Sequence, residues 1–493
     1  MVMIGWLALG AFTWNQEAVF YGGDVYFTDG DCYSRMTRVR MIEEVGLRSI
    51  RWHGWENFPQ GTAPHTTMPL DALIAGMSAA LAPFTARHLE LAGAWVSPAL
   101  GIATVFFLMI WGLVAKWPHW WAMGLMAAVS PILAHGFELG RPDHQSLLVL
   151  LIAVALASEV EIWRKNETLW CYVSAAAWGL ALWVSLFEPA VLLGAVMAAR
   201  LVVRKLGIGL KPLAVFLGIL SLALILDGWR ASEFHEAFDR WALNIGELRS
   251  AGWSVMFSWC GWLVVPATAI LAWRAFREGG AVVGMFAGLL VLLMALCFWH
   301  ARWGYFLALV FAMSLPWVLA AFRWRWLAAV ILLISLWPVA AEWEGMLYPR
   351  GEAFQARIEK MADAVALREA ALAIQNLPEG GVLAPWWFCP AIVWWSGQPC
   401  IGGSSHQSLP GIVDSCRFYL ATDDAAAREI LHQRKVGYVF AYEPERVVSN
   451  SEQILGEKSN GGTLAERLYK NSPPPWLEPL FQNRFFRVYR VAD

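Results

Sequence analysis

Residues 140–162 read GRPDHQSLLVLLIAVALASEVEI, a polar turn followed by an apolar stretch. At 1.5 Å per helical residue, about 20 residues cross the roughly 30 Å hydrocarbon core of a membrane. Comparable stretches recur through the first 341 residues, at about 2–20, 90–115, 119–138, 144–162, 169–186, 188–203, 212–227, 252–273, 281–299, 303–321 and 325–341. This pattern predicts a polytopic α-helical membrane protein with about 11 to 13 spans.

The composition supports a membrane protein and excludes several other classes. The chain is 58% hydrophobic and 15% charged, whereas globular domains are about 45 to 50% apolar and about 25% charged. A net charge of -2 excludes a strongly basic nucleic-acid binder. The low polarity excludes a disordered or coiled-coil chain. The sequence has neither a P-loop nor a GxGxxG pattern, so no nucleotide partner is expected.

Basic residues indicate the orientation of the predicted spans. Every second loop carries lysine or arginine: Lys116; Arg164 and Lys165; Arg204, Lys205 and Lys211; Arg274 and Arg277; Arg323 and Arg325. Such loops are cytoplasmic. The periplasmic or external face then receives the first loop, residues 22–89, together with the predicted active site and the C-terminal domain, in a protein of the inner membrane. Within that loop, Pro69–Phe84 is too short to span and is predicted to lie along the interface.

The last 152 residues differ from the rest of the chain. Residues 342–493 hold 33 of the 76 charged residues, so a membrane domain at 1–341 is predicted to precede an external α/β domain. Helices are expected at 353–377 and 424–434, and strands at 381–385 and 437–442. A disulfide among Cys389, Cys400 and Cys416 is left open.

Two short acidic motifs fall on the predicted external face. Asp29 and Asp31, in the first loop, either hold a divalent cation through carboxylate oxygens or form a solvated turn. Asp143 and His144 follow Pro142 at a membrane boundary, where packing alone does not require ionisable groups. The alternative is that Asp143 caps the helix that begins at His144. Both roles are compatible.

Two further features point to the same face. Arg302 begins a span, where an arginine either extends to lipid headgroups or binds phosphate oxygens. Residues 380–413 contain no charged residue and include Trp386 and Trp387. Such a stretch is either a hydrophobic core, packed within its domain or on the membrane, or an aromatic platform for an acceptor or a sugar.

The order of these motifs resembles the catalytic subunit of oligosaccharyltransferase. The motifs are an external DxD with Tyr and Arg, GRPDH two spans later, Asn-Ile-Gly-Glu at 244–247, a boundary Arg and a Trp-Trp pair. That family belongs to the polyprenyl-linked-sugar glycosyltransferases of the C-type fold. The resemblance implies that Asp31 and Glu247 are catalytic and, with Asp143, bind Mn²⁺ or Mg²⁺. It also implies that Arg302 and Arg141 contact the donor phosphate.

The chain departs from the family pattern at two positions. Gln145 stands where the family has a second acid. The resemblance therefore implies that His144 or water supplies the missing metal ligand. Phe388 replaces the Asp of the W-W-D motif, whose carboxylate recognises the sequon hydroxyl. Trp386 and Trp387 remain the implied acceptor-binding residues, but transfer to Asn-X-Ser/Thr is in doubt.

We therefore expect transfer of a glycan from a polyprenyl phosphate or diphosphate donor to a protein, lipid or glycan acceptor, within membrane lipid. One alternative is a transporter or flippase for a lipid-linked substrate. Its expected signs are ionisable residues inside the membrane and discontinuous helices in repeated halves. The predicted spans are nearly free of charge and show no clear internal repeat. A second alternative is a membrane scaffold with an external binding domain.

Overall fold

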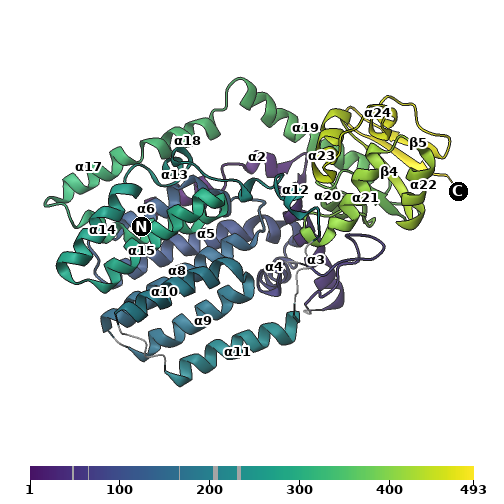
Figure 1. Ribbon diagram of the computed structural model, residues 1–493. Helices are drawn as coiled ribbons and strands as arrows, with labels where there is room; N and C mark the ends of the chain where they lie inside the picture. Colours follow the sequence, from purple (N-terminus) through teal and green to yellow (C-terminus); the bar gives the residue numbers. More distant parts are fainter. Residues whose placement is uncertain (47–48, 65, 166, 204–208, 230–234, 493) are drawn as a thin grey trace. The chain divides into compact units, whose positions relative to one another are not determined.

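The computed structural model describes residues 1–46, 49–64, 66–165, 167–203, 209–229 and 235–492 (Figure 1). Two basic residues of the predicted cytoplasmic loops, Arg204 and Lys205, lie outside the described residues. The chain forms two compact units. The first comprises residues 1–25, 66–226 and 246–350, and the second comprises residues 26–65, 227–245 and 351–493. Two segments from the N-terminal two thirds of the chain thus pack with the C-terminal residues.

The first unit is built almost entirely of helices. They are α1 (Val2–Phe12), α2 (Gln16–Val19), α4 (Met68–Leu81), α5 (His88–Val114), α6 (Trp121–Val129), α7 (Pro131–Gly136), α8 (His144–Lys165), α9 (Thr168–Val184), α10 (Phe187–Val202), α11 (Leu210–Asp227), η1 (Gly246–Leu248), α13 (Trp253–Cys260), α14 (Val264–Glu278), α15 (Ala281–Trp299), η2 (Ala301–Trp303), α16 (Gly304–Leu319), α17 (Arg325–Ser335) and α18 (Trp337–Leu347). A short antiparallel pair, β1 (Phe20–Tyr21) and β2 (Asp24–Val25), follows α2.

Fewer helices are long enough to span a membrane than the hydropathy pattern predicts. Among the described residues, five helices meet the length and composition of a span, or seven when each of two bent pairs counts as one. The predicted span at 252–273 is the pair α13 and α14, which meet at 79°. Gly261 lies at the bend with φ +78°, a conformation that glycine adopts without steric cost. The predicted span at 325–341 is likewise two helices, α17 and α18, bent by 43° before Pro338.

Other predicted spans are shortened rather than absent. Thr13–Asn15 interrupts the stretch at 2–20, and Pro131 begins a new helix within the stretch at 119–138. The apolar segment after Pro69 is the 14-residue helix α4, as predicted for a segment too short to span. The coarse prediction of a helical protein with several apolar membrane-length helices is confirmed.

Helices α8, α9, α10 and α11 lie side by side in the first unit (Figure 1). The central helix of this unit is α16, which packs against α6, α8, α13, α14 and α15. The candidate span that includes α16 is 94% buried inside the protein, whereas α11 is 11% buried. The helix α11 therefore presents its apolar surface to lipid, and α16 presents its surface to other helices.

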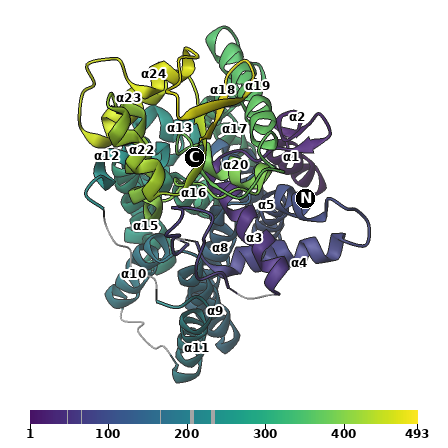
Figure 2. The same ribbon diagram turned by 90° about the vertical axis from the view of Figure 1, so that its right-hand side faces the viewer.

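The second unit contains a four-stranded mixed sheet in the order β3-β4-β6-β5. Its strands are β3 (Gly381–Leu383), β4 (Val436–Ala441), β5 (Leu477–Gln482) and β6 (Arg487–Val491), with β3 parallel to β4 and the other pairs antiparallel. Its helices are α3 (Gly30–Val45), α12 (Phe238–Ala242), α19 (Glu352–Leu372), α20 (Cys389–Ser396), η3 (His406–Ser408), α21 (Leu409–Leu420), α22 (Asp424–Gln433), α23 (Pro444–Leu455) and α24 (Leu464–Tyr469). Helices α22 and α24 pack against β4, and α22, α23 and α24 lie in the same region of the ribbon in Figure 2.

The sequence-based elements of this unit agree with the structure to within a few residues. The helices predicted at 353–377 and 424–434 are α19 and α22, and the predicted strands are β3 and β4. All seven cysteines lie in the described residues, and each is a free thiol. The disulfide left open among Cys389, Cys400 and Cys416 is therefore absent from the structure.

Candidate active site

The turn before α8 carries the first acidic residues of the site. Gly140 has φ +74°, and its amide donates to the carbonyl of Ala94 in α5 at 3.0 Å. Ser97, also in α5, donates from Oγ to the carbonyl of Arg141. Asp143 follows, and both the amide and the imidazole Nδ1 of His144 lie within 2.8 Å of its Oδ1. The turn is thus fixed to α5, and Asp143 is hydrogen-bonded to the first residue of α8.

The guanidinium of Arg141 lies close to carboxylates from separate segments of the first unit. Its Nη1 lies 3.7 Å from Glu138 Oε1, and its Nη2 lies 3.8 Å from Asp143 Oδ2. The same Nη2 lies 3.5 Å from Glu247 Oε1, which comes from η1, more than 100 residues later. Among the described side chains, three carboxylates therefore meet around one guanidinium. The sequence-predicted residues Arg141, Asp143 and Glu247 are brought together.

Burial and a neighbouring acid both favour the protonated form of Glu247. Burial raises the pKa of the Glu247 carboxyl above its ordinary value of 4.5, and the negative charge of Asp143 raises the pKa further. The positive charges of Arg141 and Arg302 act in the opposite direction but do not reverse this shift. A carboxyl with a raised pKa beside another acid marks a place where a cation is favoured.

Two residues that the sequence analysis did not select support Glu247. Tyr305, in α16, donates from its hydroxyl to Glu247 Oε1 at 3.1 Å. His135 Nδ1 lies 2.8 Å from the same hydroxyl, and its ring stacks on that of Tyr305. Both residues lie within apolar segments, where hydropathy gives no sign of a polar role. Hydrogen bonds thus run from His135 through Tyr305 to Glu247 and attach the Glu247 carboxylate to the central helix α16.

Arg302 is held by a partner that was also not predicted. Its Nη2 lies 2.6 Å from Glu188 Oε1, at the first turn of α10. Ser185 donates to the other oxygen of Glu188 at 2.5 Å. Glu188 is 2% exposed, while the side chain of Arg302 is 24% exposed. The buried acid therefore fixes the direction of a guanidinium whose exposed part is accessible to an anion.

Asp31 belongs to the second unit, near the start of α3. Asp29 caps this helix, because its Oδ1 accepts the amide of Cys32 at 3.0 Å. Asp31 is exposed in the first turn. A Cβ placed on Gly30 would lie 3.6 Å from the carbonyl oxygen of Trp387. The DxD segment and the Trp-Trp segment are therefore neighbours within this unit, which the sequence order alone does not reveal.

The uncharged stretch at 380–413 has two parts. Helix α20 is largely buried, and Trp394 packs edge-on to Phe27 and beneath Arg40. This part fits the hydrophobic-core interpretation. Trp386 and Trp387 are half-buried, with ring centroids 5.9 Å apart at 86°. They retain accessible aromatic surface next to Asp31's helix.

Phe388 occupies the position of the family's acceptor-reading Asp. Its ring lies 4.9 Å from Tyr442 and 5.1 Å from Phe486, measured between ring centroids. The side chain thus takes part in an aromatic cluster of the α/β unit. This position offers an acceptor no carboxylate.

The donor set of the first unit fits a hard divalent cation. Asp143 and Glu247 supply carboxylate oxygens, which Mg²⁺ and Mn²⁺ prefer, and the charge balance around Arg141 favours a cation. Gln145, with its amide nitrogen turned toward Asp143, lies 2.7 Å from Asp143 Oδ2 and so occupies one side of this carboxylate. Among the described residues, no group of three or more His, Cys, Asp or Glu side chains is arranged around a metal position.

The chain resembles known proteins in structure and not in sequence. No protein-family model matches the sequence, and no curated protein matches it. The archaeal oligosaccharyltransferase AglB from Archaeoglobus fulgidus, solved with an inhibitory peptide and a dolichol-phosphate, is similar in structure. Its TM-score is 0.68 at 13% identity, over 95% of this chain and 71% of AglB.

Two further solved structures have the same architecture. ArnT from Cupriavidus metallidurans gives a TM-score of 0.60 at 13% identity, over 99% of this chain and 96% of ArnT. The arabinofuranosyltransferase AftD from Mycobacteria gives 0.57 at 15% identity, over all of this chain and 40% of AftD. The chain has the C-type glycosyltransferase fold. The fold that the family resemblance implied is thereby confirmed.

Proposed function

We propose that this protein transfers a sugar or glycan from a polyprenyl phosphate or diphosphate to an acceptor on the external face of the inner membrane. The cluster in which Asp143 and Glu247 share Arg141, with Arg302 beside Glu247, is the observation that carries the proposal. It lies at the start of α8, about 33 Å along a 22-residue helix from the basic residues Arg164 and Lys165 at its end. By the positive-inside rule, the acidic end is external.

Structures of the neighbouring proteins support a lipid-linked donor and a metal. AglB is described with a dolichol-phosphate and also with Zn and sulfate. ArnT is described with undecaprenyl phosphate, at a TM-score of 0.53. By analogy, we propose a polyprenyl donor for this chain and a divalent cation, Mn²⁺ or Mg²⁺, held by Asp143, Glu247 and Asp31, with His144 or water completing the shell.

The chemistry proposed for the donor side follows from charge. Breaking the bond between the anomeric carbon and the phosphate oxygen leaves negative charge on the phosphate. A bound divalent cation would supply Lewis-acid stabilisation of that charge. Arg302, fixed by Glu188, and Arg141 place guanidinium groups for the same phosphate oxygens. Their positions are set before the donor binds, so little reorganisation is needed during transfer.

The residues proposed to act on the acceptor belong to the second unit. Asp31 orients the nucleophilic group or accepts its proton as the new bond to the anomeric carbon forms. Trp386 and Trp387 provide aromatic faces for a sugar or another apolar acceptor surface. Because Phe388 lies in an aromatic cluster, we propose that acceptor recognition does not rely on a carboxylate here. This favours a lipid or glycan acceptor over a protein sequon.

The proposed topology has about 11 to 13 crossings, when bent pairs and helices shorter than 18 residues are included. The C-terminal residues from 342 are proposed to be periplasmic. Maleimide labelling of single cysteines introduced at Lys165 and at Glu478 in intact cells tests this. We expect a membrane-impermeant reagent to label the second position and not the first.

The central test is a transfer assay with the full chain in proteoliposomes, a polyprenyl-phosphate-linked sugar and Mn²⁺. Asp31→Asn and Asp143→Asn are each expected to lower transfer about 100- to 1000-fold, and EDTA is expected to lower transfer by the unmodified protein at least as much. Glu278→Gln is the control, because Glu278 is an exposed carboxylate at the end of α14. Full activity in both Asp variants, or activity that survives EDTA, would falsify the proposal. Mass spectrometry of cellular glycans with and without the gene identifies the acceptor.

Two features of the structure are of the kind expected for the transporter alternative. The bent pair α13 and α14 is a discontinuous helix, and Glu159 and Arg200 form a buried ion pair inside predicted spans. The same proteoliposomes therefore separate the alternatives. A flippase would move a fluorescent lipid-linked donor across the bilayer with no acceptor present, whereas a transferase would not.

A further inference from the structure

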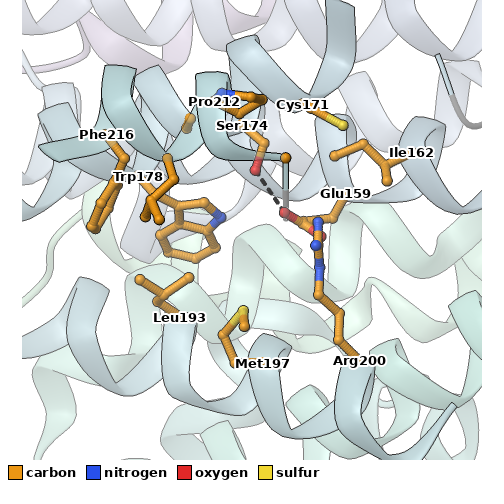
Figure 3. A pocket seen from close by; sticks show the side chains of 13 residues that line it. Glu159, Ile162, Cys171, Ser174, Trp178, Leu193, Met197, Arg200, Pro212 and Phe216 are labelled. Carbon is orange, nitrogen blue, oxygen red and sulfur yellow. Dashed lines mark hydrogen bonds and ion pairs between the residues drawn. The ribbon is translucent and has the colours of Figure 1, made fainter. Parts of the chain in front are cut away.

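A cavity of about 210 Å³ lies among α8, α9, α10 and α11, away from the candidate active site (Figure 3). Its walls are mainly apolar and include Trp178, Leu193, Met197 and Phe216. Glu159 and Arg200 form its polar end. Both residues lie near the ends of their helices that are remote from Asp143, so the polar end of the cavity lies toward the basic residues Arg164 and Lys165 at the end of α8.

The polar end of the cavity is an ion pair whose acceptor atoms are fully used. Arg200 Nε donates to Glu159 Oε2 at 2.8 Å, and Arg200 Nη2 lies 2.6 Å from the same oxygen. Ser174 donates to Glu159 Oε1 at 2.6 Å. Figure 3 shows these side chains converging from α8, α9 and α10. Glu159 is 2% exposed and Arg200 is 6% exposed, so the group is held away from water.

Two hydrogen-bond donors remain at this end. Within the described chain, the remaining nitrogen of Arg200, Nη1, forms no hydrogen bond, and it is not among the fully buried atoms that lack a partner. Among the described residues, the buried indole Nε1 of Trp178 also has no hydrogen-bond partner. A buried polar group without a partner costs about 1–3 kcal/mol. This cost applies to the Trp178 indole. Both groups are donors, so an occupant that supplies acceptor oxygens and an apolar body satisfies the cavity.

The surroundings indicate where such an occupant comes from. One wall is α11, whose membrane-length segment is 11% buried, so this helix borders lipid. Lys211, exposed at the start of α11, precedes Pro212 of the wall. Lys165 ends α8 about 9 Å along the helix from Glu159. An anionic headgroup at this rim would meet positive charge, and an acyl chain would follow the apolar walls inward.

We propose that the cavity binds one acidic glycerophospholipid from the leaflet that contacts the basic loops. An ester carbonyl of the lipid accepts hydrogen bonds from Arg200 Nη1 and Trp178 Nε1, and its phosphate lies toward Lys211. Because the Glu159–Arg200 pair is neutral overall, a neutral carbonyl is a better partner at depth than a second charge. This site is separate from the donor and acceptor residues of the proposed transfer reaction, and it does not depend on that function.

Cys171 provides a direct measurement, because it lines the cavity and is partly exposed while the other six cysteines are buried. The full chain is placed in nanodiscs of phosphatidylcholine, with or without one third phosphatidylglycerol. The rate of N-ethylmaleimide addition at Cys171 is then followed by peptide mass spectrometry. We expect phosphatidylglycerol to slow labelling at least fivefold.

Two variants and one apolar probe complete the experiment. Met197→Trp fills the cavity and is expected to remove the dependence on phosphatidylglycerol, while Trp178→Phe deletes one donor and is expected to weaken it. Dodecane added to the phosphatidylcholine nanodiscs is expected to give little protection, because it has no acceptor. Three results would each overturn the proposal. They are equal labelling in the two lipid mixtures, protection by dodecane equal to that by phosphatidylglycerol, and an undiminished effect of phosphatidylglycerol on labelling in Met197→Trp.

Discussion

Two groups of charged side chains lie toward opposite ends of α8, and they are balanced differently. Near its C-terminal end, Glu159 and Arg200 form a one-to-one pair in which both carboxylate oxygens accept hydrogen bonds. At its N-terminal end, Asp143 and Glu247 share Arg141 with a third acid, Glu138. A balanced buried pair leaves no net charge to attract a cation, but removing one partner leaves the other charge uncompensated. A cluster rich in acids is a place to hold a cation.

Breaking the balanced pair is expected to have the largest effect on stability. Glu159→Gln leaves a buried guanidinium without its counter-ion, which costs about 3 to 5 kcal/mol. The double variant Glu159→Leu/Arg200→Met is expected to recover most of this loss, because neither charge remains. Unfolding by SDS in mixed micelles measures both. A single variant as stable as the unmodified protein would contradict the account of a satisfied ion pair.

Neutralising the acid-rich cluster is expected to affect activity rather than stability. Asp143→Asn and Glu247→Gln should each lower transfer about 100- to 1000-fold, the range for loss of one group that stabilises a developing charge. Neither should lower the unfolding temperature, because each removes one of several like charges. The proteoliposome transfer assay and a melting curve test the two halves of this prediction. If Asp143→Asn or Glu247→Gln destabilised the protein as much as Glu159→Gln, the proposed difference between the two charge clusters would be wrong.

Glu188 is expected to act on donor binding through Arg302. Glu188→Gln keeps the size of the side chain but removes the charge that directs the guanidinium. We expect the KM for the lipid-linked donor to rise about tenfold, equivalent to about 1.4 kcal/mol, with kcat nearly unchanged. Glu188→Asp should restore part of the affinity. A fall in kcat with an unaltered KM would show that Glu188 does not position Arg302 for the donor.

The smallest effect expected is a pH dependence of stability at the acid-rich cluster. Because burial and Asp143 raise the pKa of Glu247 above 4.5, the folded chain binds this proton more tightly than the unfolded chain. The resulting stabilisation is fully present below about pH 4.5 and is lost as pH rises through the raised pKa. The unmodified protein should therefore lose stability relative to Glu247→Gln between pH 4.5 and 7.5. Added Mn²⁺ at pH 7.5 should restore part of it, and a flat difference would contradict this assignment.

The sequence predicted the acid-rich cluster better than the balanced pair. Asp143 stands at the end of a predicted span, where a charge is conspicuous, whereas Glu247 lies in a loop with several other acids and was selected by the family resemblance. Glu159 and Arg200 lie 41 residues apart, inside stretches read as nearly free of charge. Their pairing depends on how α8 and α10 pack, which periodicity does not encode. Glu188 and Tyr305 were missed for the same reason.

The bends of the spans were missed for a different reason. A hydropathy window averages over the glycine at 261 and the proline at 338, so two short helices read as one long stretch. In the second unit, local sequence patterns predicted β3, β4, α19 and α22. They did not reveal that residues 26–65 and 227–245 pack with that unit, because contacts between distant segments leave no local pattern.

The burial of α16 bears on how the protein enters the membrane. Among the five single-helix candidate spans, the segment containing α16 is the least apolar and the most enclosed. Lipid is therefore a poorer environment for it than the surfaces of α6 and α8, which are synthesised earlier and pack against it. Release of this segment from the translocon is favoured once those helices are already in the bilayer, so the centre of the fold is completed late in biosynthesis.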